Sequence, residues 1–167
     1  GFPSIFAEYT GISASGFGAT IGIEYVPGDT TIGAKSRTDT DATDTTDDDG
    51  TYTAKAEVSD YLTAYIEPTF QFTENFGFYV KGGVSTVTIN TLENLALGDD
   101  SSTYGNVDVM GGMWGIGIKG THSSGVFLKL EGLKTHFESV ALSSNTGNKN
   151  KIQAVPRMES VRVAIGY

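Results

Sequence analysis

Apolar and polar residues alternate one by one over long stretches of this chain, and this period of two constrains the fold more than any other feature. Residues 17–25 read Phe-Gly-Ala-Thr-Ile-Gly-Ile-Glu-Tyr, and residues 161–167 read Val-Arg-Val-Ala-Ile-Gly-Tyr. Successive side chains of a β-strand point to opposite faces of a sheet, so each stretch predicts a strand with one apolar face. Helical periodicity is almost absent. The sequence therefore predicts an all-β, antiparallel fold.

The alternation falls into extended segments joined by connections of two kinds. We predict seven segments in one domain over residues 1–167, at 3–13, 16–36, 51–72, 76–91, 105–121, 125–142 and 150–167. Short connections at 13–16, 73–75 and 122–125 alternate with long ones around 38–50, 92–104 and 143–149. Tight turns at one end and long loops at the other are typical of up-and-down transmembrane β-barrels, whereas a soluble β-sandwich predicts no such rhythm.

Seven strands conflict with the even strand number of such barrels, because two unpaired edges would then face lipid. We expect an eight-stranded barrel in the intact protein, with an upstream strand that was cleaved or is supplied by another chain. The alternative is a turn at Pro27-Gly28-Asp29, which would divide segment 16–36 and give eight strands within these residues. Pro68 has no backbone N–H to donate to a neighbouring strand, which predicts a bulge near the periplasmic rim.

The ionisable residues separate by face. The apolar face of the membrane-length portions carries no charge, and we expect it to contact lipid through Ile21, Ile23, Leu62, Ile66, Val80, Trp114, Ile116, Leu128, Leu130, Val163 and Ile165. The opposite face carries four acids and four bases, namely Glu8, Glu24, Glu67, Glu131, Lys81, Lys119, Lys129 and Arg162. An eight-stranded barrel is just wide enough for its interior to be filled by side chains, and buried charges must be paired. We therefore predict a salt-bridged interior, with glycines on the same face leaving room for long side chains. The net charge of −9 then lies in loops and rims.

The C-terminal segment Ser160-Val161-Arg162-Val163-Ala164-Ile165-Gly166-Tyr167 resembles the terminal β-signal of outer-membrane proteins. The layout resembles the OmpA/OmpX-type and opacity-type small barrels. The segments at 4–9 and 23–27 are similar to small barrels of marine alphaproteobacteria. The resemblance implies a bacterial outer-membrane location, a lipid-bilayer environment and recognition of Val161–Tyr167 by the barrel assembly machinery. In these relatives the first segment corresponds to a second strand.

Candidate binding and catalytic residues are few. The loop residues Asp39, Asp41, Asp44, Asp47, Asp48 and Asp49 form a weak candidate metal site, because oxygen-rich loops can bind Ca²⁺, but the EF-hand spacing is absent. A solvated, repulsive loop is the simpler interpretation. His122 and His136 are expected to lie far apart, and we expect Glu67 and Glu131 to pair with lysines or Arg162 rather than to act as acids or bases. We predict no cofactor and no enzyme activity. The chain contains no cysteine, and its acidic balance argues against nucleic-acid binding.

Three functions remain open at this level. The first is a structural or surface-interaction barrel, either single or in an oligomer, that contacts partners through its acidic outer loops. The second is a narrow pore for small solutes or ions, which the balanced interior charges disfavour. The third is a soluble lipocalin-like binding barrel, in which the apolar faces would enclose a core instead of facing lipid.

Overall fold

The computed structural model describes residues 2–39, 50–94, 104–144 and 151–167. Strands dominate these residues: β1 (Ile5–Ile12), β2 (Phe17–Val26), β3 (Thr30–Asp39), β4 (Gly50–Gln71), β5 (Phe76–Asn94), β6 (Val107–Thr121), β7 (Phe127–Phe137), β8 (Val140–Ser143), β9 (Lys151–Ala154) and β10 (Arg157–Gly166). The main sheet has the order β1-β2-β4-β5-β6-β7-β10, with β3 paired to β4, while β8 and β9 form a separate two-stranded ribbon. The predicted all-β, antiparallel fold is confirmed. Within the described ranges, no helix is long and apolar enough to cross a membrane.

The predicted segment 16–36 consists of β2 followed by β3. Both strands pair antiparallel with β4, so the chain keeps its direction through residues 27–29. Pro27 lacks a backbone donor and Gly28 has a φ of 87°, which interrupts the ladder without reversing the chain. The predicted pairing of 16–36 with 51–72 is confirmed, and the alternative of a chain-reversing turn at Pro27-Gly28-Asp29 is wrong.

Two other segments are shorter than predicted. Segment 125–142 divides into β7 and β8, and segment 150–167 divides into β9 and β10. At these breaks the backbone N–H of Phe137 donates to the carbonyl of Pro156 at 3.1 Å, and that of Glu138 donates to the carbonyl of Met110 at 2.9 Å. Pro156 has no N–H for a continuous ladder, so β8 and β9 leave the main sheet and pair with each other.

The predicted bulge at Pro68 is also wrong. Pro68 faces Ala19 in an unbroken β2–β4 register, and the β4–β5 pairing omits Glu67 and Pro68 but resumes in the same register at Thr69. The missing donor therefore removes a local pair without shifting the strands. The register of β4 shifts instead between Ser59 and Leu62, where Asp60 adopts a φ of 53°.

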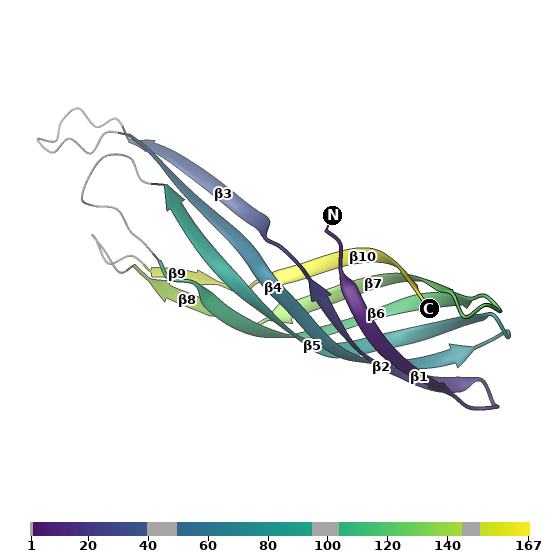
Figure 1. Cartoon of the computed structure of the whole chain (residues 1–167). Helices are drawn as coiled ribbons and strands as arrows, with labels where there is room; N and C mark the ends of the chain where they lie inside the picture. The colour runs from purple at the N-terminus through teal and green to yellow at the C-terminus, as the bar shows by residue number, and fades with distance from the viewer. Residues whose placement is uncertain (1, 40–49, 95–103, 145–150) are drawn as a thin grey trace, which may run out of the picture.

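The strands define two ends of the molecule (Figure 1). The turn end carries the three short connections, in which Gly16 and Gly125 adopt positive φ values of 83° and 92° that favour glycine. The loop end carries β3, β8, β9 and the halves of β4 and β5 that lie farthest from the short connections. The predicted short connections all lie at the turn end.

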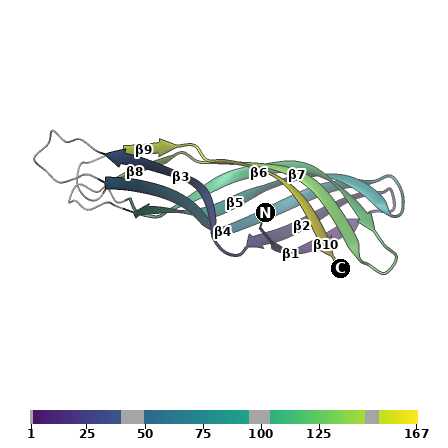
Figure 2. The same cartoon turned by 90° about the horizontal axis from the view of Figure 1, so that it is seen from above.

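The sheet is strongly rolled, so that it has an inner and an outer face (Figure 2). Phe6 on β1 lies 6.2 Å from Phe127 on β7, measured between ring centroids, although these strands are not neighbours in the sheet. The strand order ends at β1 and β10, so the rolled sheet is open along these two edges.

Candidate functional site

Every pass of the main sheet places a charged side chain on its inner face. Glu8 lies on β1, Glu24 on β2, Glu67 on β4, Lys81 on β5, Lys119 on β6, Lys129 and Glu131 on β7, and Arg162 on β10. The strand pattern explains this placement, because each of these residues alternates with outward-facing apolar neighbours. The structure brings all eight residues into ion pairs with one another.

Six of these residues form one continuous network of alternating charge. Glu8 accepts from Lys119 at 3.3 Å and from Lys129 at 2.5 Å. Lys129 also reaches Glu67 at 2.7 Å, and Glu67 lies 3.2 Å from Lys81. Glu131 is the last member of the network and lies 3.3 Å from Lys81. We call these six residues the inner charge network; its three acids and three bases sum to zero.

Burial makes the pairing in this network obligatory. The side chains of Glu67, Lys81 and Lys129 are no more than 3% exposed. A charge removed from water is costly unless an opposite charge and hydrogen bonds compensate it. The network therefore joins β1 to β6 and β7 across the inner space and holds the sheet in its rolled shape.

Two tyrosines that the sequence analysis did not single out complete the network. Tyr79 donates its hydroxyl to Glu131 at 2.9 Å, and Tyr65 donates to Glu8 at 3.1 Å. The ammonium of Lys81 also lies 3.8 Å from the centroid of the Tyr65 ring, within cation–π range. The signal for these residues was present, since both tyrosines occupy inner positions of the alternating pattern.

Glycines make space for these rings. A Cβ atom at Gly22 would collide with the Tyr65 ring, and one at Gly117 would collide with the Tyr79 ring. The predicted role of inner glycines, leaving room for long side chains, therefore applies at these two positions to tyrosines rather than to charged residues.

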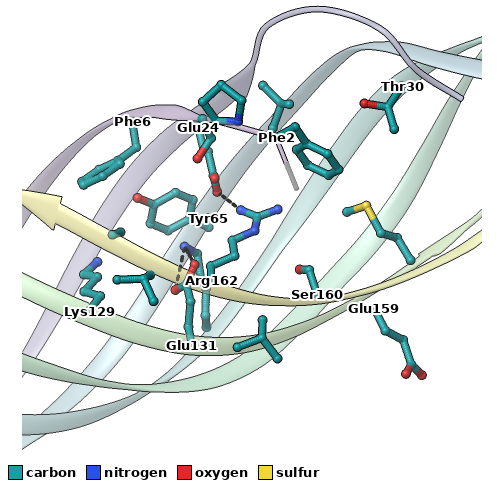
Figure 3. Close-up of a pocket in the computed structure, with 18 of the residues that line it drawn as sticks. Phe2, Phe6, Glu24, Thr30, Tyr65, Lys129, Glu131, Glu159, Ser160 and Arg162 are labelled. Atoms are coloured by element: carbon teal, nitrogen blue, oxygen red, sulfur yellow. Dashed lines mark hydrogen bonds and ion pairs between the residues drawn. The ribbon is translucent and has the colours of Figure 1, made fainter.

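The remaining inner pair, Glu24 and Arg162, joins β2 to β10 (Figure 3). It lies in a hollow of about 630 Å³ that is also lined by Tyr65 and Lys81. This pair spans the open side of the rolled sheet, because β2 is the neighbour of edge strand β1 and β10 is the other edge.

The outer face has the opposite character. The eleven residues expected to contact lipid are all between 46% and 71% exposed on this face. Once further exposed apolar side chains are added, the surface has members on each of the seven passes; the added residues are Ile5, Tyr9, Phe17, Phe76, Phe78, Val84, Met110, Ile118, Val161 and Tyr167. We call this surface the apolar belt. It covers residues 62–70 on β4, 76–84 on β5 and 110–118 on β6 without a charged residue on the outer face.

Polarity reverses toward the loop end. The inner space there is filled by a cluster of buried apolar residues, which comprises Val26, Tyr61, Val87, Ile89, Val109, Phe137 and Val140. The outer face now carries polar groups: Asp60 accepts from Tyr25 at 3.2 Å, Asp108 accepts from Thr88 at 2.7 Å, and Lys134 pairs with Glu159 at 2.9 Å. We call the seven buried residues the apolar plug.

The other sequence candidates lie apart from this site. Asp39 ends β3, while the remaining aspartates of the candidate metal loop, Asp41, Asp44, Asp47, Asp48 and Asp49, lie outside the described residues. In the described part of the chain, no three His, Asp or Glu side chains are grouped as metal ligands. His122 lies in the turn before β7, where its Nδ1 accepts a hydrogen bond from the backbone N–H of Ser124 and lies 2.9 Å from the hydroxyl of the same residue. His136 lies near the other end of β7.

The site therefore neutralises its own buried charges, because each carboxylate of the inner charge network is held by an ammonium group. Comparison with known proteins adds no relative: no family model, no curated protein and no solved structure matches this chain.

Proposed function

We propose that this chain forms the body of a transmembrane β-barrel in a bacterial outer membrane, with an interior filled by its own side chains. Its role is structural or one of surface interaction, not catalysis. The observation that carries the proposal is the reversal of polarity across the sheet: the apolar belt faces outward while paired charges face inward. Water surrounding the belt would leave a large apolar surface exposed, and a lipid bilayer removes that cost.

The dimensions of the apolar belt support the same environment. Its stretches on β4, β5 and β6 match the roughly 9–11 residues with which a tilted strand crosses the hydrocarbon core. Aromatic residues Phe17, Phe70, Phe76 and Phe78 gather beside the short turns, as expected of an interfacial girdle. Asp60 and the Lys134–Glu159 pair mark where the belt ends toward the loops.

A soluble lipocalin-like barrel fits these observations poorly. Such a protein keeps its apolar side chains inside and its charges in water. Here the buried residues near the turn end include the charged Glu67, Lys81, Lys129 and Glu131, and the exposed residues on the same strands include Leu, Ile, Val and Phe. The third function considered from the sequence is therefore disfavoured.

Two layers of side chains argue against conduction. The inner charge network crosses the interior near the turn end, and the apolar plug fills it toward the loops. A pore needs a continuous wet path. We therefore expect no stepwise conductance in planar bilayers, and clear single-channel openings would contradict a filled interior and favour the narrow pore.

The single tryptophan gives a direct test of the membrane proposal. Trp114 is 53% exposed on the outer face of β6 within the belt, and its neighbour across the β6–β7 ladder is Lys134 at the loop-side margin of the belt. In vesicles whose acyl chains carry bromine, its fluorescence should be strongly quenched, while iodide in the water should have little effect. Trp114→Phe/Phe137→Trp is the matched control, because it moves the reporter into the apolar plug. Strong quenching by iodide together with no quenching by brominated lipid would exclude the proposal.

A further inference from the structure

The two open edges of the sheet run in the same direction. Neighbours along the order β1-β2-β4-β5-β6-β7-β10 are all antiparallel, so the direction reverses six times between β1 and β10. Both edge strands therefore run from the loop end to the turn end. A direct pairing between them would be parallel, in a sheet that is otherwise wholly antiparallel.

A continuous groove separates these edges. One hollow of about 630 Å³ lies between Phe2–Phe6 and Ser160–Ile165, and a second of about 880 Å³ continues it between Ser4–Ile12 and Ile165–Tyr167. Figure 3 shows the first hollow with Phe6, Ser160 and Arg162 around it. The groove thus follows β1 on one side and β10 on the other along their length.

We propose that a single strand of the same polypeptide, N-terminal to residue 1, occupies this groove and runs antiparallel to both β1 and β10. The inference rests on the proposed membrane location, because backbone N–H and C=O groups that face lipid without a hydrogen-bond partner are strongly destabilising. One strand in this direction pairs with both edges at once and leaves no edge open.

The groove also defines the chemistry of its occupant. Val161, Val163 and Ile165 are 71–81% exposed on the outer side of β10, so alternate residues of the added strand must be apolar to continue the belt. The inner charges already balance, so its inward positions must be neutral. A hydroxyl or amide there is favoured by the Oγ atom of Ser160, which is buried without a hydrogen-bond partner.

A second copy of the protein fits the groove less well. Copies in one membrane share one orientation across it, so β1 and β10 of a neighbour run in the same direction as β1 and β10 of the first copy. Every edge-to-edge contact between such copies would be parallel. Only a strand running from the turn end to the loop end gives antiparallel pairing on both sides.

The position of the first residues favours an upstream source over a downstream one. Pairing of β1 with β2 begins at Ile5, and Phe2, Pro3 and Ser4 line the hollow together with Ser160–Ile165. A strand that rises between β10 and β1 ends at this loop end of the groove. It can therefore continue directly into these residues.

Hydrogen exchange on the full-length protein, isolated from the membrane of its host and reconstituted in lipid, tests the occupancy of the groove. The amides of β1 and β10 that do not bond to β2 or β7 should be as protected as those in the middle of β5. Rapid exchange of these amides would overturn the proposal. The intact mass should place at least about nine residues ahead of Gly1. A mature chain that starts at Gly1, or that is extended only beyond Tyr167, would equally overturn it.

Disulfide formation in the same protein distinguishes the other ways of closing the groove, because the 167 residues contain no cysteine. Ala7→Cys is combined in turn with Val161→Cys, Val163→Cys and Ile165→Cys. The control pairs are Ala7→Cys/Ile23→Cys and Leu130→Cys/Val163→Cys, which are direct neighbours in the sheet.

Two strand spacings amount to about 9.6 Å, beyond the ~7 Å limit for a disulfide. We therefore expect the control pairs to oxidise and the edge pairs to remain reduced. An edge pair that oxidises within one chain would show direct β1–β10 closure, and one that oxidises between chains would show a second copy; both results contradict the proposal. Quenching of Trp114 by brominated lipid is measured on the same samples, so failure of the membrane location is recognised separately.

Discussion

The turn end and the loop end of the same sheet follow opposite rules. Near the turns, the inner face holds Glu8, Glu67, Lys81 and Lys129, and the outer face is apolar. Toward the loops, the inner face holds the apolar plug and the outer face carries polar groups such as Asp60. Strands β4, β5 and β6 pass through both regions without interruption.

The contrast teaches that the strand pattern alone does not define inside and outside. Alternation fixes two faces, and the surrounding solvent decides which of them is apolar. The loop-end region has the distribution of a water-soluble protein, and the turn-end region has its inverse. Under the proposed membrane location, the register shift between Ser59 and Leu62 on β4 marks the boundary between the two solvents.

The largest effect that tests this contrast is loss of a buried cation. Lys129→Met removes the ammonium that lies 2.5 Å from Glu8 and 2.7 Å from Glu67, and leaves three acids against two bases in the inner charge network. We expect the free energy of unfolding in lipid vesicles to fall by about 3–5 kcal/mol, measured by urea titration. The control on the same strand is Lys134→Met, whose side chain is 48% exposed.

An equal unfolding midpoint for Lys129→Met and Lys134→Met would show that the inner charges are solvated and that the two regions do not differ. Lys81→Met should resemble Lys129→Met, because Lys81 contacts Glu67 and Glu131. Adding Glu67→Gln to Lys129→Met should restore part of the loss, since it brings the network back to two acids and two bases.

Placing a charge on the outer face should discriminate the two regions next most strongly. Ile116 is 63% exposed within the apolar belt. Ile116→Arg should cost about 2–4 kcal/mol if its position lies near the bilayer centre. Ala34→Arg, on the exposed face of β3, should change the same unfolding free energy little. Comparable, small effects for both substitutions would argue that water surrounds the belt.

Removal of one methylene group from the apolar plug, and of one from the apolar belt, gives a finer comparison of the two faces. Ile89 is buried in the apolar plug, and Ile89→Val should cost about 0.5–1.5 kcal/mol. Ile116→Val removes the same group from a side chain that is already exposed to solvent or lipid, so its effect should be smaller. A larger loss for Ile116→Val than for Ile89→Val in urea titrations would place the packed core on the opposite face.

Much of this fold could be predicted because local alternation carries it. The strand segments, the short turns and the inner positions of residues such as Glu67 and Lys129 all follow from a period of two, which needs no knowledge of distant contacts. The pairing of 16–36 with 51–72 followed from their similar length and from the rhythm of the connections.

The features that the sequence analysis missed depend on contacts between distant strands. Tyr65 and Tyr79 belong to the same inner face as the charges, yet their hydroxyls meet Glu8 and Glu131 only after the sheet has rolled. The separation of β8 and β9 from the main sheet arises where Pro156 meets Phe137. The bulge lies near Asp60 instead of Pro68, because a missing donor need not shift a register.

The smallest effect concerns an ion pair outside the belt, where the loop-end region should behave as an ordinary soluble surface. Glu57 on β4 accepts from Lys55 and, at 3.2 Å, from Thr31. The hydrogen bond from Lys55 is the main cause that lowers the pKa of the Glu57 carboxyl below its usual value of 4.5. A lowered pKa stabilises the fold above the unfolded-state pKa, and this contribution is lost as the pH falls through the folded-state pKa.

Glu57→Gln should therefore weaken the fold slightly at pH 7 and not at all in strong acid, whereas Lys129→Met should have a far larger effect at pH 7. Unfolding titrations at both pH values and a carboxyl NMR titration of Glu57 provide the measurement. A pKa at or above 4.5, or a loss at pH 7 as large as that of Lys129→Met, would contradict the distinction between a partly exposed pair and the inner charge network.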